Sequence, residues 1–182
     1  MLFRSGSGVR QGAAQFASRH HRYYARRALR DVDVQQVRDP RQLLKEWVTL
    51  YGHLIARHNL SGLHAFSPLA FQHQLATPGI VAFRAVKNHE TVAAQLWYQD
   101  NEVAYSHLFA ANATGYETNA AYALYWHAID YFADKVRWVN LGGAAGAGNH
   151  QSGLDFFKRG WSNQVRPALL CGRILDRNQY ET

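Results

Sequence analysis

The stretch GIVAFRAVKNHETVAAQLWYQDNEVAYSHLFA, residues 79–110, decides the fold. It contains three segments rich in β-branched and aromatic residues, 79–86, 91–99 and 102–110, which is the composition of strands. The connections between them, 87–90 and 100–101, are of hairpin length. We therefore expect three consecutive strands that pair antiparallel as a meander.

Downstream of the meander, a loop at 111–118 leads to a helix from about 119 to 134 that is apolar on most sides and thus buried. A short apolar strand, 136–141, then enters LGGAAGAGNHQSGLDFFKRGW, residues 141–161. Its glycines permit a close approach of a ligand to the backbone, and the start of the short helix at 152–159 offers unpaired N–H groups. This stretch is therefore a candidate site. A last strand is expected at about 164–172.

Upstream of the meander, residues 29–37 show a weak edge-strand pattern. Asp39-Pro40 and Ser67-Pro68 are helix starts, the first for a helix to about His58 and the second for a short helix to about Leu75. The order β-α-α-β-β-β-α-β-α-β predicts a mixed α+β fold, an antiparallel meander followed by βαβα. It excludes a Rossmann fold and a barrel.

Length and composition are those of one globular domain, with 182 residues and 47% hydrophobic content. No apolar run approaches the roughly 18 residues of a membrane span. A single cysteine, Cys171, allows no internal disulfide and indicates a reducing compartment, so we expect a cytoplasmic protein. His127, Asp130 and Asp134 share a helix face, which we interpret as solvated; we expect no metal site.

Positive charge is concentrated at the start of the chain. The net charge is +7, and residues 1–30 hold seven arginines and no acid, which leaves 13 basic and 13 acidic side chains in the rest. We expect a flexible basic arm at 1–28 and a folded domain at 29–182, and we expect no DNA partner because the folded body carries no net charge. Contact with RNA or an acidic partner, and an organelle transit peptide, remain open interpretations of the arm.

Several segments, in this order, resemble the GNAT acyltransferases and, among them, the Fem-type (FemAB-like) branch found in bacteria. They are YSHLFA at 105–110 with Tyr116, the helix at 120–132, VNLGG at 139–143, and GLDFFKRGW at 153–161, which resembles that branch's FK-x-G-aromatic signature. The resemblance covers about residues 22–171. Fem-type proteins usually carry two GNAT-like domains, so this chain resembles one C-terminal half or a free-standing single-domain relative.

The resemblance implies transfer of an acyl or aminoacyl group to an amine on a small molecule or peptide, with no tightly bound cofactor. The donor is acetyl-CoA in ordinary GNAT enzymes and aminoacyl-tRNA in Fem-type ones, so tRNA is a possible partner through the donor or the basic arm. The loop at 111–119, where ordinary GNAT enzymes bind pyrophosphate, has one glycine, no basic residue, and Glu117. It fits the Fem-type pattern better. A non-catalytic GNAT-like module that binds a peptide, tRNA or protein is the alternative.

The resemblance also assigns roles to single residues. His107 becomes a candidate base, and Lys158 a candidate contact for an anionic group. Phe156 and Phe157 occupy the helix that carries the usual tyrosine acid, and they cannot donate a proton. For the candidates, ordinary structural roles such as a packed strand histidine, packed aromatic rings and a solvated lysine are the competing interpretations. The remaining candidates are Tyr105 and Tyr116 as catalytic residues, Leu108, Phe109, Ala110, Thr114 and Gly115 as donor-binding residues, and Gly143, Asn149 and Arg159 as substrate-binding residues.

Overall fold

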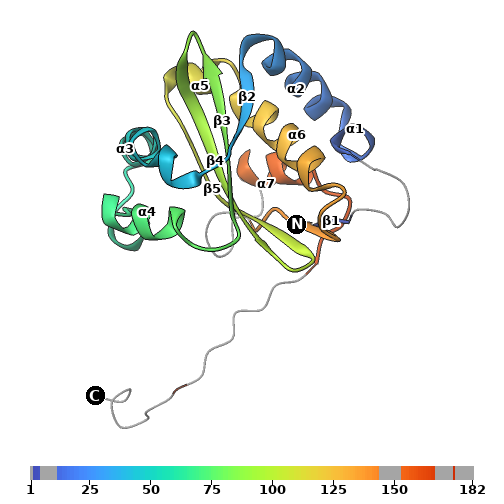
Figure 1. Cartoon of the computed structure of the whole chain (residues 1–182). Helices are drawn as coiled ribbons and strands as arrows, with labels where there is room; N and C mark the ends of the chain where they lie inside the picture. Colours follow the sequence, from blue (N-terminus) through green and yellow to red (C-terminus); the bar gives the residue numbers. More distant parts are fainter. Residues whose placement is uncertain (1, 5–11, 144–152, 167–173, 175–182) are drawn as a thin grey trace.

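A six-stranded mixed sheet forms the centre of the molecule in the computed structural model, which describes residues 2–4, 12–143, 153–166 and 174. The strand order is β1-β6-β5-β4-β3-β2, and only the β5–β6 pair is parallel. The predicted meander is confirmed as β3, β4 and β5 (Figure 1). The strands are β1 Leu2–Arg4, β2 Asp33–Val37, β3 Ile80–Lys87, β4 Glu90–Asp100, β5 Val103–Ala111 and β6 Trp138–Asn140.

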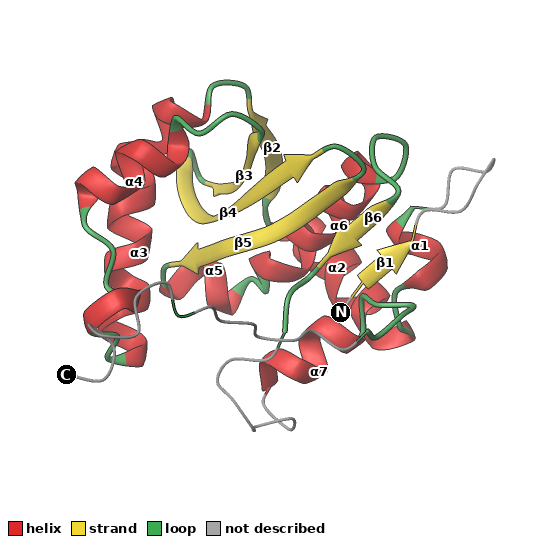
Figure 2. Cartoon of the chain, turned by 90° about the horizontal axis from the view of Figure 1, so that it is seen from below, coloured by secondary structure: helices red, strands yellow, loops and turns green. Residues whose placement is uncertain are grey.

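Helices cover both faces of the sheet (Figures 1 and 2). One face carries η1 Pro40–Leu43, α3 Leu44–His58 and α4 Pro68–Leu75, with η2 Gly62–His64 between them. The other carries α1 Ala13–Phe16, α2 Arg19–Asp31, α6 Ala120–Phe132 and α7 Gly153–Arg159, while α5 Ala113–Glu117 links β5 to α6. This is the predicted α+β architecture. In the part of the chain that the structure describes, every helix is too short or too polar to span a bilayer.

Two apolar cores lie on the two faces of the sheet. Trp97 and Phe132 belong to the core under α2 and α6, and Trp47 and Leu96 to the core under α3 and α4. Strand β4 separates them, which is why its central residues are buried on both sides. The sheet position of β4 therefore fixes the two layers of helices.

Local signals set the helix ends as the sequence predicted. The Asp39 side chain accepts from the Arg41 amide ahead of η1, and Ser67 accepts from the Ala70 amide ahead of α4. Asn59 ends α3 in the left-handed conformation at φ 50°. Of the predicted last strand at 164–172, Gln164 makes an isolated β-bridge, and residues 167–172 lie outside the described part.

In the described part of the expected arm at 1–28, α1 and α2 pack on α6, so the folded body begins before residue 29. Residues 19–31 form the ordered helix α2, which packs on α6 and buries His21, Ala25 and Ala28. Residues 2–4 add an edge strand to β6. The sequence did not predict this packing because α2 buries alanines and a histidine in place of large aliphatic residues, so its inner face is inconspicuous beside its five arginines.

His21 joins α2 to α7. Its Nε2 lies 2.8 Å from the carbonyl oxygen of Phe157, and its Nδ1 lies 2.8 Å from the Ser18 hydroxyl. A carbonyl only accepts, so Nε2–H donates to Phe157 and the hydroxyl of Ser18 donates to Nδ1. The ring is fully buried, and burial lowers its pKa below the usual value. At Gly160 a side chain would overlap the His21 ring, so this position needs glycine.

The neutral state of His21 predicts a loss of stability in mild acid. Because its pKa is lowered in the folded state, the unfolded chain binds more protons below pH about 6.5, so the free energy of unfolding falls as pH falls from there. Burial lowers the pKa of His107 and His127 too, and these add to the same trend. In His21→Gln we expect a loss of about 1–3 kcal/mol at pH 7.5 and a weaker pH dependence, measured by urea unfolding between pH 5 and 7.5.

The matched control for this prediction is His53→Gln, at an exposed position of α3. It should leave both the stability and its pH dependence close to those of the parent chain. Equal effects of the two substitutions would contradict the assigned role of His21.

Candidate functional site

A pocket of about 420 Å³ opens along β5, between α3 on one side and α6 and α7 on the other. Its walls come from five elements: α3, the consecutive β5, α5 and α6, and α7. The lining residues are Leu54 and His58 of α3, Ser106, His107, Leu108 and Phe109 of β5, Tyr116 of α5, Ala121 and Tyr125 of α6, and Leu154, Phe157 and Lys158 of α7.

The pocket exists because β5 and β6 separate. Their parallel pairing covers three residue pairs, from Val103 with Trp138 to Tyr105 with Asn140, whereas β5 continues to Ala111. Just after β6, the Asn140 side chain accepts from the Gly142 amide at 2.8 Å, and Gly142 has φ 74°. This turn directs the chain away from β5, so the remainder of β5 borders the pocket.

A bulge in β5 brings side chains of both sheet faces to the pocket. Trp97 pairs with Ser106 while its neighbour Leu96 pairs with Leu108, so His107 is the extra residue. As a result, Ser106 points to the α6 side, where it meets Tyr125, and His107 points to the α4 side, where it meets Gln74.

His107 contacts Gln74 and Tyr98 at the edge of the pocket. Its Nε2 lies 3.1 Å from Gln74 Oε1, and its ring lies 4.9 Å from that of Tyr98. With the amide oxygen as acceptor, Nε2 carries the hydrogen and Nδ1 keeps a lone pair. Partial burial lowers the His107 pKa, which favours the neutral ring at pH 7.

Tyr125 and Ser106 form a polar pair in an otherwise apolar wall. Their oxygens lie 2.9 Å apart, and the tyrosine ring is fixed by edge contacts with Phe157 at 4.9 Å and Trp97 at 5.9 Å. Burial raises the Tyr125 pKa, and the hydrogen bond to Ser106 offsets part of that rise. The phenol is therefore protonated at neutral pH and can donate.

Lys158 borders the pocket from α7. Its Nζ donates to the Gly143 carbonyl at 2.6 Å, and partial burial lowers its pKa. The predicted substrate-binding residue Gly143 thus contributes its carbonyl to the position of Lys158. Among the residues that the structure describes, His58, His107 and Lys158 line the pocket, and no carboxylate does.

Of the predicted site residues, the structure brings His107, Leu108, Phe109, Tyr116 and Lys158 to one pocket. Others lie elsewhere. Tyr105 is exposed and pairs with Tyr98, Ala110 is buried in the core under α3, and Arg159 donates to Asp155 at 2.6 Å. Asn149 lies outside the described residues.

The two donor-binding candidates in α5 do not line the pocket. Thr114 uses its carbonyl to accept from the Thr118 hydroxyl at 2.8 Å. Gly115 is buried against the Val92 carbonyl of β4, and its amide donates to the Asn112 side chain at 2.9 Å. Instead of a loop, α5 is a short helix whose cap is supplied by Asn112. The Gly115 amide is therefore already used, and its glycine serves packing.

The sequence did not identify six pocket residues, namely Leu54, His58, Ser106, Ala121, Tyr125 and Leu154. Tyr125 is the most informative of them, because it provides a phenol where α7 offers phenylalanines. The one available signal was a tyrosine within a nearly apolar helix, since a buried phenol usually has a partner. Which partner it meets depends on the bulge in β5.

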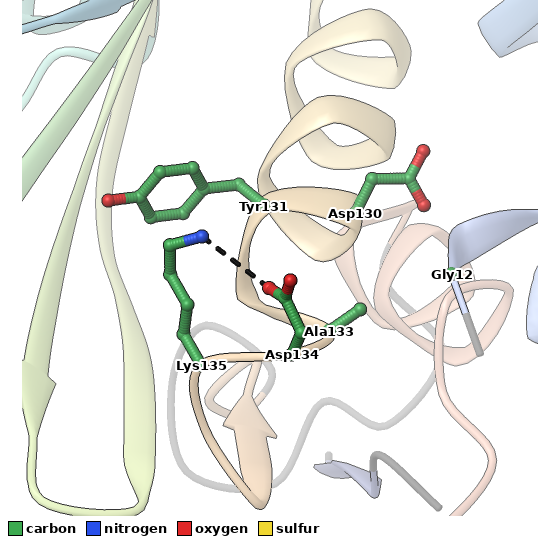
Figure 3. A pocket seen from close by; sticks show the side chains of 6 residues that line it. All are labelled: Gly12, Asp130, Tyr131, Ala133, Asp134 and Lys135. Atoms are coloured by element: carbon green, nitrogen blue, oxygen red, sulfur yellow. Dashed lines mark hydrogen bonds and ion pairs between the residues drawn. The ribbon is translucent and has the colours of Figure 1, made fainter. Parts of the chain in front are cut away.

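A second, polar pocket lies at the end of α6 (Figure 3). Asp130 accepts there from the Ala13 amide at 2.7 Å and thereby holds α1, and burial raises its pKa. Lys135 reaches Asp134 at 3.4 Å and lies 4.3 Å from the ring centre of Tyr131. These acids thus have structural partners. Within the described ranges, no three His, Cys, Asp or Glu side chains gather as metal ligands would.

Comparison with solved structures identifies the fold. FemX superposes with a TM-score of 0.69 at 12% identity over 88% of this chain and 57% of its own. An aminoglycoside acetyltransferase from an uncultured soil metagenomic sample, solved with sisomicin, gives 0.60 at 12% identity over 81% of this chain and 98% of its own. A ribosomal-protein-alanine N-acetyltransferase from Brucella melitensis biovar Abortus gives 0.56 at 14% identity over 79% and 99%.

The chain has the fold of the GNAT-type acyltransferases, as the order of its segments predicted. FemX shares this fold, and this chain spans little more than half the length of FemX. No protein-family model matches the sequence, and no curated protein is significantly similar to it.

The packing role of Gly115 is testable by substitution. Gly115→Ala would press a methyl group against the Val92 carbonyl, so we expect a loss of about 1–3 kcal/mol in the free energy of unfolding. Gly143→Ala is the matched control, since a side chain there meets no atom within 4 Å. It should change stability by less than about 0.5 kcal/mol. A Gly115→Ala protein as stable as the parent in urea unfolding would remove this explanation.

Proposed function

We propose that this chain is an N-acyltransferase that moves an acyl or aminoacyl group to an amine on a small molecule or peptide. The observation that carries the proposal is the pocket where β5 leaves β6, which combines a neutral histidine, a protonated phenol and a lysine on apolar walls. A protein of this fold needs such a pocket to align a carbonyl carbon with an amine. The single cysteine supports a reducing compartment, the cytoplasm.

Each group has a role in the proposed reaction. The amine attacks the carbonyl carbon of the donor, a C–N bond forms, and His107 Nδ1 takes the proton that the amine loses. The bond to the leaving sulfur or oxygen breaks, and the Tyr125 hydroxyl, directly or through Ser106, supplies a proton to it. Lys158 stabilises the negative charge that develops on the donor. In sum, one proton passes from the amine to the leaving group.

The donor is an acyl-CoA or an aminoacyl-tRNA. The acetyltransferases of the same fold support the first, and the similarity to FemX supports the second. Both donors present an activated carbonyl on a phosphate-bearing carrier. Neither requires a tightly bound cofactor.

Activity should depend on the three groups assigned to the pocket. We expect His107→Gln to lower kcat/KM about a hundredfold, because the base is lost. Tyr125→Phe keeps the aromatic ring but removes the proton donor, and Lys158→Met keeps the apolar part of the side chain but removes the charge. Each should lower kcat/KM about tenfold or more. The measurement is release of CoA or tRNA in the presence of an amine panel, with acetyl-CoA, longer acyl-CoAs and an aminoacyl-tRNA as donors.

Lys135→Met serves as the control, because it removes an exposed lysine at the other pocket. It should retain the parent activity. A folded protein that neither transfers from any of these donors nor is stabilised by them in thermal unfolding would disprove the enzyme.

A specific observation favours a second candidate, a non-catalytic module that binds RNA. Arg19, Arg22, Arg26 and Arg30 recur at helical spacing on α2, next to the exposed Tyr23. Helix α2 has no lysine, and its arginines can pair with phosphates through the planar guanidinium group. An exposed tyrosine can stack on a base. In this interpretation, the tRNA contact expected for the basic start of the chain would be made by the ordered helix α2.

The RNA interpretation predicts a strong salt dependence. For the triple variant Arg19→Gln, Arg26→Gln and Arg30→Gln, we expect the slope of log K against log salt to fall by about 2, since each phosphate contact on a single strand contributes about 0.7. The measurement is fluorescence anisotropy with a labelled RNA hairpin.

The charge-matched control for the RNA test substitutes Arg38, Arg41 and Arg137 by glutamine. An equal loss in this control would show that binding reflects net charge alone. RNA binding by a chain that transfers no acyl group would favour the module over the enzyme.

A further inference from the structure

Lys158 gives the pocket a positive charge, whereas the segment 111–119, where ordinary GNAT enzymes bind pyrophosphate, provides none. Residues 111–119 contain no basic side chain, the α5 amide of Gly115 is capped, and Glu117 is exposed beside Tyr116. Nevertheless, the described residues that line the pocket include two histidines and a lysine and no carboxylate. The basic groups come from other elements, which directs attention to the end of α3.

The last turn of α3 places His58 in the lining of the pocket and Arg57 against Tyr116, another lining residue. Leu54, Arg57 and His58 lie at i, i+3 and i+4 and share one helix face. Leu54 and His58 line the pocket, and the Arg57 guanidinium carbon lies 4.1 Å from the ring centre of Tyr116, which also lines it. The α3 and α5 segments thus meet through an arginine on an aromatic ring.

The position of Arg57 leaves its hydrogen-bonding groups for a ligand. Its side chain is exposed, and within the described residues no carboxylate lies within ion-pair distance of it. A guanidinium over a ring is held by its face and keeps its edge N–H groups free for bidentate pairing. A helix end also favours a basic residue electrostatically, but that role needs no contact with Tyr116.

We propose that Arg57, with His58 beside it, forms a phosphate subsite for the acyl donor, in place of the backbone cradle on the loop after β5. The proposal rests on the proposed acyl transfer, because it assigns the phosphate to the carrier of the acyl group. The pantetheine-like or acyl part of the donor then runs along the apolar wall of Leu108 and Phe109, toward His107. The chemistry is a phosphate or pyrophosphate on either a CoA or the 3′ end of a tRNA.

The test compares donors with and without phosphate. We measure, by calorimetry, the affinities of CoA, of phosphate-free pantetheine, of inorganic pyrophosphate and of an aminoacylated RNA minihelix for the parent chain and for Arg57→Gln. We expect CoA or the minihelix to bind at least about tenfold more weakly to the variant, and pantetheine to bind both alike. Pyrophosphate should compete with the donor for the parent chain. Glu117→Gln should tighten donor binding, because it removes a repelling charge.

The control is Arg41→Gln, which removes an exposed arginine at the opposite end of the same helical segment, where it pairs with Asp39. It should leave all affinities unchanged, and both variants should unfold at the parent temperature. Preferred binding of CoA would identify the nucleotide carrier, and preferred binding of the minihelix the RNA carrier. Equal affinities in Arg57→Gln and Arg41→Gln, or equal affinity of the parent chain for CoA and pantetheine with no binding of the minihelix, would overturn the subsite.

Failure of the subsite and failure of the proposed function give different results. Acyl transfer that is insensitive to Arg57→Gln would support the proposed enzyme and contradict the proposed subsite. Donor binding that depends on Arg57, with no transfer from any donor, would support the proposed subsite and contradict the proposed enzyme.

Discussion

The separation of β5 from β6 is the constraint on which the site depends. Parallel neighbours normally stay paired along their length, but here the pairing ends after three residues. The turn at Asn140 and Gly142 sends the chain away, and the freed edge of β5 needs another neighbour. Among the described residues, the seven-residue α7 covers that edge only in part, and a pocket remains beside the bulge at His107. The same local turn thus determines where a ligand can approach the sheet.

The wall of the pocket that α7 forms depends on helix α2. Helix α7 has seven residues, and helices of that length are not stable alone. It is held by the hydrogen bond from His21 to the Phe157 carbonyl and by the packing of Phe157 and Trp161 on α6. The segment that looked like a dispensable arm therefore fixes one wall of the pocket. Its arginines face outward because its inner face is needed for this contact.

The sequence was most informative where a pattern is local. The meander could be predicted because each strand carries its own composition and each connection is short, and Ser67 and Asn59 mark helix ends through their own side chains. Helix α2 could not, because its buried face is made of alanine and histidine. The pairing of Ser106 with Tyr125 was equally hidden, since it requires a one-residue bulge that moves Ser106 to the α6 side. Such relations depend on how distant elements pack and leave no periodic trace.

The same reasoning explains why the phosphate loop appeared deficient. A loop inspected alone should contain its own glycines and basic residues, and residues 111–119 do not. The folded chain instead places Arg57 over Tyr116, across 59 positions of sequence, and no carboxylate is among the described lining residues. A guanidinium binds phosphate through its side chain, so it depends less on the backbone conformation than a set of backbone N–H groups does. The proposed subsite would allow a GNAT-type chain without the glycine-rich loop to bind a phosphate-bearing donor, because a neighbouring helix supplies the charge.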